Sequence, residues 1–199
     1  MTTIISKTIS NQVLDKAMRL FWEKGYFNTS VDELIAVTGF NRRAIYHFFG
    51  GKRDLFLALL MRYRAEVTDK LTAPLQNYSD GLKAIETFFH QFLHLRDSDN
   101  PCGCFLIATA SDMPSHDQEV AQVIERFSAE LNEYFQACLT QAFSNTESCE
   151  KPDIKGIADF LVVNVFGLMT MDRAQVDQEV IRTHVEMVTQ FLNLQKYRN

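Results

Sequence analysis

Cysteine and uninterrupted apolar runs are both scarce in this chain, which has four cysteines among 199 residues. Four cysteines are too few for a disulfide scaffold, and a reducing cytosol would keep most of them as thiols. The longest apolar stretch, residues 160–171, is too short to span a bilayer and contains Asn164 and Thr170. The N-terminus carries no basic-then-apolar export signal. These absences predict a cytoplasmic protein without a membrane span.

Sequence patterns of common enzymes are also missing. The chain has no Gly-rich phosphate loop, no Gly-x-Ser-x-Gly, no His-Glu-x-x-His and no Cys-x-x-Cys. The pair Cys102 and Cys104, taken with His90, His94 or His116, lacks the ligand spacing of structural zinc sites. We therefore predict no metal, no cofactor and no enzymatic activity. The alternative that the sequence leaves open is a redox enzyme working through Cys102 and Cys104.

The net charge of −5 is unevenly distributed. Residues 1–70 hold 11 Lys and Arg against 7 Asp and Glu, whereas residues 71–199 hold 9 against 18. A basic N-terminal part joined to an acidic remainder favours a protein that presents one end to a polyanion. The overall acidity argues against a nonspecific architectural DNA-binding protein, which relies on many phosphate contacts.

Apolar residues recur at helical spacing almost throughout, and no segment alternates apolar and polar residues between hairpin turns. The pattern therefore predicts an all-α protein. We expect helices around residues 13–21, 56–67, 82–92, 120–139, 154–171 and 176–194, with a short apolar segment at 102–110. Ser115 and Gln118 are spaced as a capping box for the long helix over 120–139. Residues 96–101 and 144–153 are expected to be loops.

Residues 29–49 carry the most informative motif. Ser30 followed by Glu33 is a capping box that begins a short helix, and Gly39 is suited to the left-handed conformation that ends it. Asn41 is then placed to cap a second short helix with a basic exposed face. That face carries Arg42, Arg43 and His47. Two short helices joined in this way predict a helix-turn-helix, with a basic helical hairpin of other function as the alternative.

The segment from Asn11 to Leu60 resembles the N-terminal domain of the tetracycline-repressor (TetR) family. The elements that recur in order are Thr29, Gly39-Phe40, Tyr46 with Phe49, Lys52 and Leu55. Ile35 and Thr38 depart from the family pattern at packing positions. The resemblance implies a three-helix helix-turn-helix DNA-binding domain over residues 1–55 and a helical effector-sensing and dimerisation domain over residues 56–199.

The resemblance also implies roles for individual residues. Arg42 and Arg43 are expected to contact guanine in the major groove, and Asn41 and His47 to contact bases or phosphates. Thr29, Tyr46 and Lys52 are expected to anchor the DNA backbone, with core packing as the alternative for Tyr46. The function implied is a sequence-specific regulator, a repressor released from a palindromic operator of double-stranded DNA by an effector.

In this family the last two helices pair with those of a second subunit, so the resemblance implies a homodimer formed by residues 154–171 and 176–194. Large apolar residues on facing helices are candidates for an effector pocket, with plain core packing as the alternative. They are Phe88, Phe92, Phe105, Phe127, Phe166 and Met169.

Residues 101–106 resemble a Gly-Cys-apolar stretch found in a branch of the family, some members of which sense electrophiles or oxidants through a cysteine there. Cys102 and Cys104 are therefore candidate sensor residues, for either a redox or a small-molecule effector. Buried structural cysteine is the alternative for Cys104, because apolar residues follow it.

Overall fold

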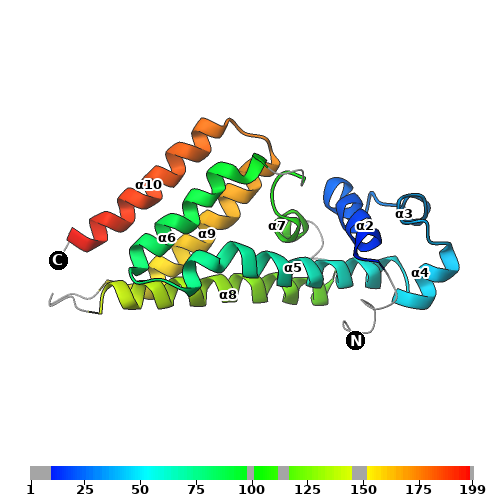
Figure 1. Cartoon of the computed structure of the whole chain (residues 1–199), viewed down its shortest axis with the longest axis horizontal. Coiled ribbons are helices and arrows are strands. Elements are labelled where there is room, and N and C mark those ends of the chain that lie inside the picture. The colour runs from blue at the N-terminus through cyan, green and yellow to red at the C-terminus, as the bar shows by residue number, and fades with distance from the viewer. Residues whose placement is uncertain (1–9, 98–100, 112–116, 145–151, 198–199) are drawn as a thin grey trace. The chain divides into compact units, whose positions relative to one another are not determined.

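A computed structural model describes residues 10–97, 101–111, 117–144 and 152–197. These ranges are helical and contain no strand, which confirms the predicted all-α class. The α-helices, labelled in Figure 1, are α2 (Asn11–Lys24), α3 (Val31–Thr38), α4 (Arg42–Phe49), α5 (Lys52–Gln76), α6 (Gly81–His90), α7 (Phe105–Ala110), α8 (Gln118–Ala142), α9 (Ile154–Arg173) and α10 (Gln178–Tyr197). A 3₁₀ helix, η1 (Gln91–Asp97), follows α6.

The chain folds into two compact units, each assembled from two stretches of sequence. The first unit comprises Met1–Glu66 with Phe105–Ile124, and the second comprises Val67–Cys104 with Glu125–Asn199. Both long helices, α5 and α8, contribute residues to each unit. The functional boundary at residue 55 that the sequence favours stays a prediction.

Aromatic side chains form the core of the first unit. Trp22 from α2 packs edge-on against Tyr63 from α5, with ring centroids 5.0 Å apart, and Phe21 meets Phe56 at the same separation. Phe105 from α7 contacts Phe56 at 5.5 Å and also Trp22 and Tyr63. Edge-to-face ring pairs contribute about 0.5–1.5 kcal/mol beyond their burial. This cluster holds α2, α5 and α7 together. Helix α3 packs against α2, and α4 packs against α3.

The second unit has an aromatic core of its own. Phe88 and Phe89 from α6 are fully buried against Phe135 from α8, and the Phe88 and Phe135 centroids lie 5.1 Å apart. Gly81 begins α6 directly against α8: a Cβ at this position would lie 1.9 Å from the carbonyl oxygen of Cys138. Only glycine permits this close approach of the two helices.

Helix α9 is apolar on most of its circumference. Its mean hydropathy reaches 1.6 over an 18-residue window, 44% of which is buried. By length and composition alone this helix is long and apolar enough to cross a membrane, a criterion that core helices of soluble proteins also meet. Asn164 and Asp172 are nevertheless buried within it. Large apolar side chains stay exposed on the described parts of α9 and α10. They are Phe160, Val163 and Met171 on α9, and Val180, Met187 and Leu194 on α10.

Candidate nucleic-acid interface

Helix α3 has a complete set of local end contacts. The Ser30 hydroxyl oxygen accepts a hydrogen bond from the Glu33 backbone N–H at 3.1 Å, and the Glu33 carboxylate accepts one from the Ser30 N–H at 2.8 Å. Gly39 ends the helix in the left-handed conformation with φ of 73°. The structure therefore confirms the predicted capping box and the predicted terminating glycine.

Helix α4 is anchored in the same way. The Asn41 side-chain oxygen accepts a hydrogen bond from the Ala44 N–H at 2.8 Å, as the sequence predicts for a cap. Ile45 is fully buried and fixes the inner face of the helix. Asn41 uses its oxygen as the cap, so its amide N–H groups are what it offers to a base or phosphate. That contact stays a prediction.

One face of α4 projects outward and carries the predicted reading residues. Arg42, Arg43, Tyr46 and His47 are all exposed, and their spacing places them on one side of the helix, away from Ile45. Tyr46 is 54% exposed, so the alternative that it packs in the core is wrong. The structure thus brings four of the seven predicted DNA-binding residues together on one exposed face of α4.

The two arginines of this face are held differently. The Arg42 Nη2 atom lies 2.7 Å from the Asp32 Oδ1 atom of α3, and both side chains are largely exposed. Arg43, by contrast, makes no ion pair with any residue of the described chain. Sequence reasoning missed Asp32, because its partner is ten positions away on another helix.

Thr29 and Lys52 lie at the edges of the helix-turn-helix. Thr29 is 1% exposed, and its hydroxyl donates to the Gly25 carbonyl at 2.8 Å, which gives it a structural role in the turn before α3. Lys52 is the first residue of α5, and its ammonium group lies 4.3 Å from the centroid of the Tyr26 ring. Partial burial lowers the pKa of Lys52 from its ordinary value. Their contacts with the DNA backbone stay predictions.

An ion pair joins α2 to α3. Lys24, the last residue of α2, binds the Glu33 carboxylate that also closes the capping box. The hydrogen bond from Lys24, together with that from the Ser30 backbone, lowers the pKa of Glu33 to about 2. Glu33 therefore stays ionised, and α3 keeps its contact with α2, across the physiological pH range.

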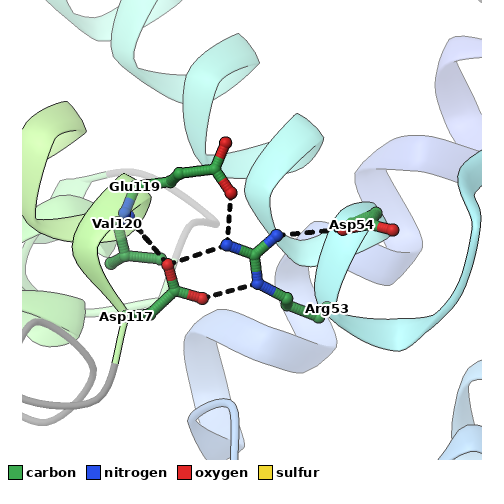
Figure 2. A network of polar contacts seen from close by, with 5 residues as sticks. All are labelled: Arg53, Asp54, Asp117, Glu119 and Val120. Atoms are coloured by element: carbon green, nitrogen blue, oxygen red, sulfur yellow. Dashed lines mark hydrogen bonds and ion pairs between the residues drawn. The ribbon is translucent and has the colours of Figure 1, made fainter.

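Figure 2 shows a second polar network, centred on Arg53 in the first turn of α5. Its guanidinium binds both oxygens of Asp117, with Nε–Oδ2 and Nη2–Oδ1 distances of 2.7 and 2.9 Å, and it also binds Glu119 and Asp54. The Arg53 hydrogen bonds are the main cause that lowers the pKa of Asp117. The reciprocal contacts raise the pKa of Arg53.

The same Asp117 caps α8. Its carboxylate accepts hydrogen bonds from the backbone N–H groups of Glu119 and Val120. Sequence reasoning assigned this cap to Ser115, which lies outside the described residues. Arg53 and Asp117 are 64 positions apart in the sequence, so no local sequence pattern predicts their contact. Through them, the start of α5, which directly follows α4, is fastened to the start of α8.

The five phenylalanines among the six residues predicted to form an effector pocket fall into separate groups of packed rings. Phe105 belongs to the core of the first unit, whereas Phe88 and Phe92 pack with each other, and Phe127 contacts Phe166 at 6.3 Å. Met169 is 4% exposed. A cavity of about 290 Å³ in the second unit is lined by other residues, from Pro74 to Thr87. The effector pocket stays a prediction.

The two candidate sensor cysteines have different surroundings. Cys102 is partly exposed, with its Sγ atom 3.9 Å from the Gln175 amide nitrogen, whereas Cys104 is 1% exposed. Gly103 between them has φ of 79°, and its N–H donates to the buried Asp172 carboxylate at 2.6 Å. The segment is thereby fixed to the end of α9. Burial agrees with a structural role for Cys104, and the sensor assignment stays a prediction.

Comparison with family models identifies both parts of the chain. Residues 13–59 match the model for bacterial regulatory proteins of the tetR family, and residues 81–188 match that for a tetracyclin repressor-like C-terminal domain.

Curated relatives and solved structures agree with these models. The chain is 31% identical over 181 residues to the uncharacterized HTH-type transcriptional regulator YezE of Bacillus subtilis, covering 88% of this chain and 91% of YezE. It is 30% identical over 157 residues to the HTH-type transcriptional repressor ComR of Escherichia coli, covering 78% and 75% of the two chains.

Among solved structures, a cysteine mutant of the TetR family regulator CifR, complexed with 26-bp double-strand operator DNA, superposes with a TM-score of 0.80 at 20% identity. The match covers 92% of this chain and 97% of that one. Reduced E. coli NemR superposes with a TM-score of 0.76 at 16% identity, covering 89% and 93%. At these identities the likeness shows the fold.

Replacement Asp117→Asn tests the Arg53 network. We expect the free energy of unfolding at about pH 7 to fall by about 1–2 kcal/mol, because the hydrogen bonds to a charged partner weaken while the part-exposed Arg53 is screened by water. The folded-state pKa of Asp117 is depressed, so its contribution is present above the ordinary Asp pKa and is lost as the pH falls through the folded pKa.

Urea denaturation at about pH 7 and about pH 3 measures this difference. The gap between wild type and Asp117→Asn should narrow in acid, and Asp54→Asn, at the exposed arm of the network, should show a smaller gap at both pH values. A gap that is the same at both pH values would contradict the assignment.

Proposed function

Because the chain belongs to the TetR family of bacterial transcriptional regulators, we propose that it represses transcription by holding a palindromic operator and that an effector releases it. Membership of the family makes it a sequence-specific DNA-binding regulator. The observation that carries the proposal further is the outward face of α4, where Arg42, Arg43, Tyr46 and His47 project together from a helix capped at both ends.

The geometry of α4 suits the major groove of B-DNA. That groove admits one α-helix, and an arginine guanidinium donates two hydrogen bonds to the O6 and N7 atoms of guanine. Arg42 and Arg43 in the first turn are placed for such contacts. Lys52 at the start of α5 and the Tyr46 hydroxyl are suited to phosphate oxygens, which set position rather than sequence.

The exposed apolar residues of α9 and α10 support a homodimer. Val180, Met187 and Leu194 recur every seven residues along α10, and Leu194 is 65% exposed. On α9, Val163 is 69% exposed. Exposed apolar residues on two neighbouring helices, at heptad spacing on α10, are covered when a second copy supplies the same pair, as a four-helix bundle. A two-fold dimer also presents two α4 helices to two half-sites.

The names of several relatives support the proposed sign of regulation. ComR and the AcnR proteins of two Corynebacterium species are named as repressors, which supports repression here. We place the protein in the cytoplasm, where its DNA target lies, and assign it no enzymatic activity. Turnover of a peroxide or disulfide by the purified protein would instead support the cysteine-based enzyme.

The dimer face is tested by Met187→Asp, which sets a charge into the apolar stripe of α10. An unpaired charge in a buried interface costs about 3 kcal/mol or more, and each subunit contributes one, so the dimer dissociation constant should rise at least about 100-fold. Analytical ultracentrifugation measures this constant. Asn193→Asp adds the same charge to an exposed position off the stripe and should leave the dimer intact. Equal behaviour of the two variants would count against this interface.

Base recognition by the outward face of α4 is tested by Arg42→Ala and Arg43→Ala. Each variant should lose about 1–3 kcal/mol of binding free energy on the specific operator and show a weaker base preference. Lys52→Ala should weaken binding to all sequences alike and reduce the salt slope by about one. Fluorescence anisotropy over a range of salt concentrations measures both quantities. If both arginine variants keep the wild-type base preference, α4 is not the reading helix.

Reaction at the Cys102–Cys104 segment is proposed to release operator DNA. Cys102 is the more accessible thiol, so a mild electrophile should modify it first and lower operator affinity about ten- to a hundredfold, because added bulk strains the packing around Gly103. Operator affinity before and after treatment is compared for wild type, Cys102→Ser and Cys104→Ser. Equal loss in all three proteins, or no loss in wild type, removes the cysteine switch.

A further inference from the structure

The Asp32–Arg42 ion pair places a carboxylate on the surface that meets a polyanion. Asp32 lies in the first turn of α3, and its side chain is 81% exposed, while the Arg42 side chain is 56% exposed. Their Oδ1 and Nη2 atoms lie 2.7 Å apart. The pair thus spans from α3 to the first residue of α4, beside the proposed guanine contacts.

Stability of the fold does not account for this pair. An ion pair between two exposed side chains contributes at most about 1 kcal/mol and often nothing measurable. An acidic residue in the first turn of α3 is favourable for the helix dipole, but that effect needs no arginine partner. Near phosphates the carboxylate is repelled, which lowers affinity for every DNA sequence.

We propose that Asp32 is a positioning residue that holds the Arg42 guanidinium for one guanine and thereby sets operator specificity. This inference rests on the proposed function of α4. A guanidinium has five N–H donors, and the Asp32 contact uses one of them, which leaves enough for the two-pronged bond to guanine O6 and N7. The long arginine side chain is ordered before binding, so less rotamer entropy is lost on DNA.

The Asp32 carboxylate also weakens complexes with nonspecific DNA. An unrestrained arginine swings readily to a phosphate, a contact that carries no sequence information. Asp32 competes for the Arg42 guanidinium and repels the phosphates, and both effects weaken nonspecific binding more than the complex in which guanine satisfies Arg42. Arg43 has no such partner among the residues that the structure describes, and it serves as the internal comparison on the same helix.

The experiment uses the full-length protein and a palindromic duplex that the wild-type protein selects from random-sequence DNA. The affinities of the wild type, Arg42→Ala and Arg43→Ala are measured for this duplex and for every single-base variant of it. These affinities identify the base position at which Arg42→Ala removes the base preference and the position at which Arg43→Ala removes it. Asp32→Asn, Asp32→Glu and the double variant Asp32→Asn/Arg42→Ala are then measured on the same set of duplexes over a range of salt concentrations.

Asp32→Asn is expected to lower the preference at the Arg42 position about tenfold and to leave the Arg43 position unchanged. Its affinity for random DNA should rise, and its salt slope should steepen by about 0.9, because Arg42 is released to a phosphate. Asp32→Glu should restore much of the preference, and the double variant should match Arg42→Ala at that position. Asp69→Asn removes the same charge from an exposed position later in α5 and should change none of these values.

Three results would overturn the proposal. The first is that Asp32→Asn tightens binding to all duplexes equally with base preference intact, which makes Asp32 a source of repulsion only. The second is that it relaxes a different position from Arg42→Ala, which makes Asp32 itself a base-reading residue. The third is that it behaves as wild type throughout. A wild-type protein that selects no sequence from the library overturns the proposed function as well, whereas a selective wild type confines the failure to Asp32.

Discussion

The shortness of α3 and α4 is the constraint on which the rest of the interface depends. Each has eight residues, and isolated helices below about 12–15 residues are marginal in water. They persist because their ends are satisfied locally, by Ser30 and Asn41 at the N-termini and by Gly39 after α3. Leu34 and Ile45, both fully buried, then fix the inner faces. The outer face of α4 is left free to carry charge.

Charged contacts add to this arrangement at its two edges. Lys24 ties α3 to α2 through Glu33, and Arg53 ties the start of α5 to Asp117 at the start of α8. Neither ion pair involves the outward face of α4, so the contacts that hold the helices leave the side chains that are proposed to contact DNA unused. The Asp32–Arg42 pair is the exception, and its position on that face is what gives it a proposed role in reading sequence.

Sequence signals that act over three or four residues predicted the local structure well. The capping box at Ser30, the left-handed Gly39 and the cap at Asn41 are confirmed, because each depends on backbone geometry within one helical turn. Gly25, with φ of 79°, ends α2 through local backbone geometry of the same kind. The resemblance carried by residues 11–60 supplied the family, and the family models support it.

Contacts between distant positions were beyond that reasoning. Nothing near Arg53 in the sequence points to its contact with Asp117. Helical spacing alone grouped Phe105 with the other candidate pocket residues, but the structure shows that its ring packs against Trp22, Phe56 and Tyr63. A stripe of aromatic residues shows that a face is buried and leaves its partner unspecified. The exposure of Tyr46 likewise needed the structure, because a tyrosine suits both core and surface.

Binding of α4 in the major groove is tested by protection of guanine N7 from methylation by dimethyl sulfate on a selected operator, because N7 lies in that groove. We expect protected guanines in two symmetric patches, with centres about one helical turn or a multiple of it apart, one for each subunit of the dimer. Operator-specific binding without any protection of guanine N7, or with protection of adenine N3 in the minor groove alone, would contradict it.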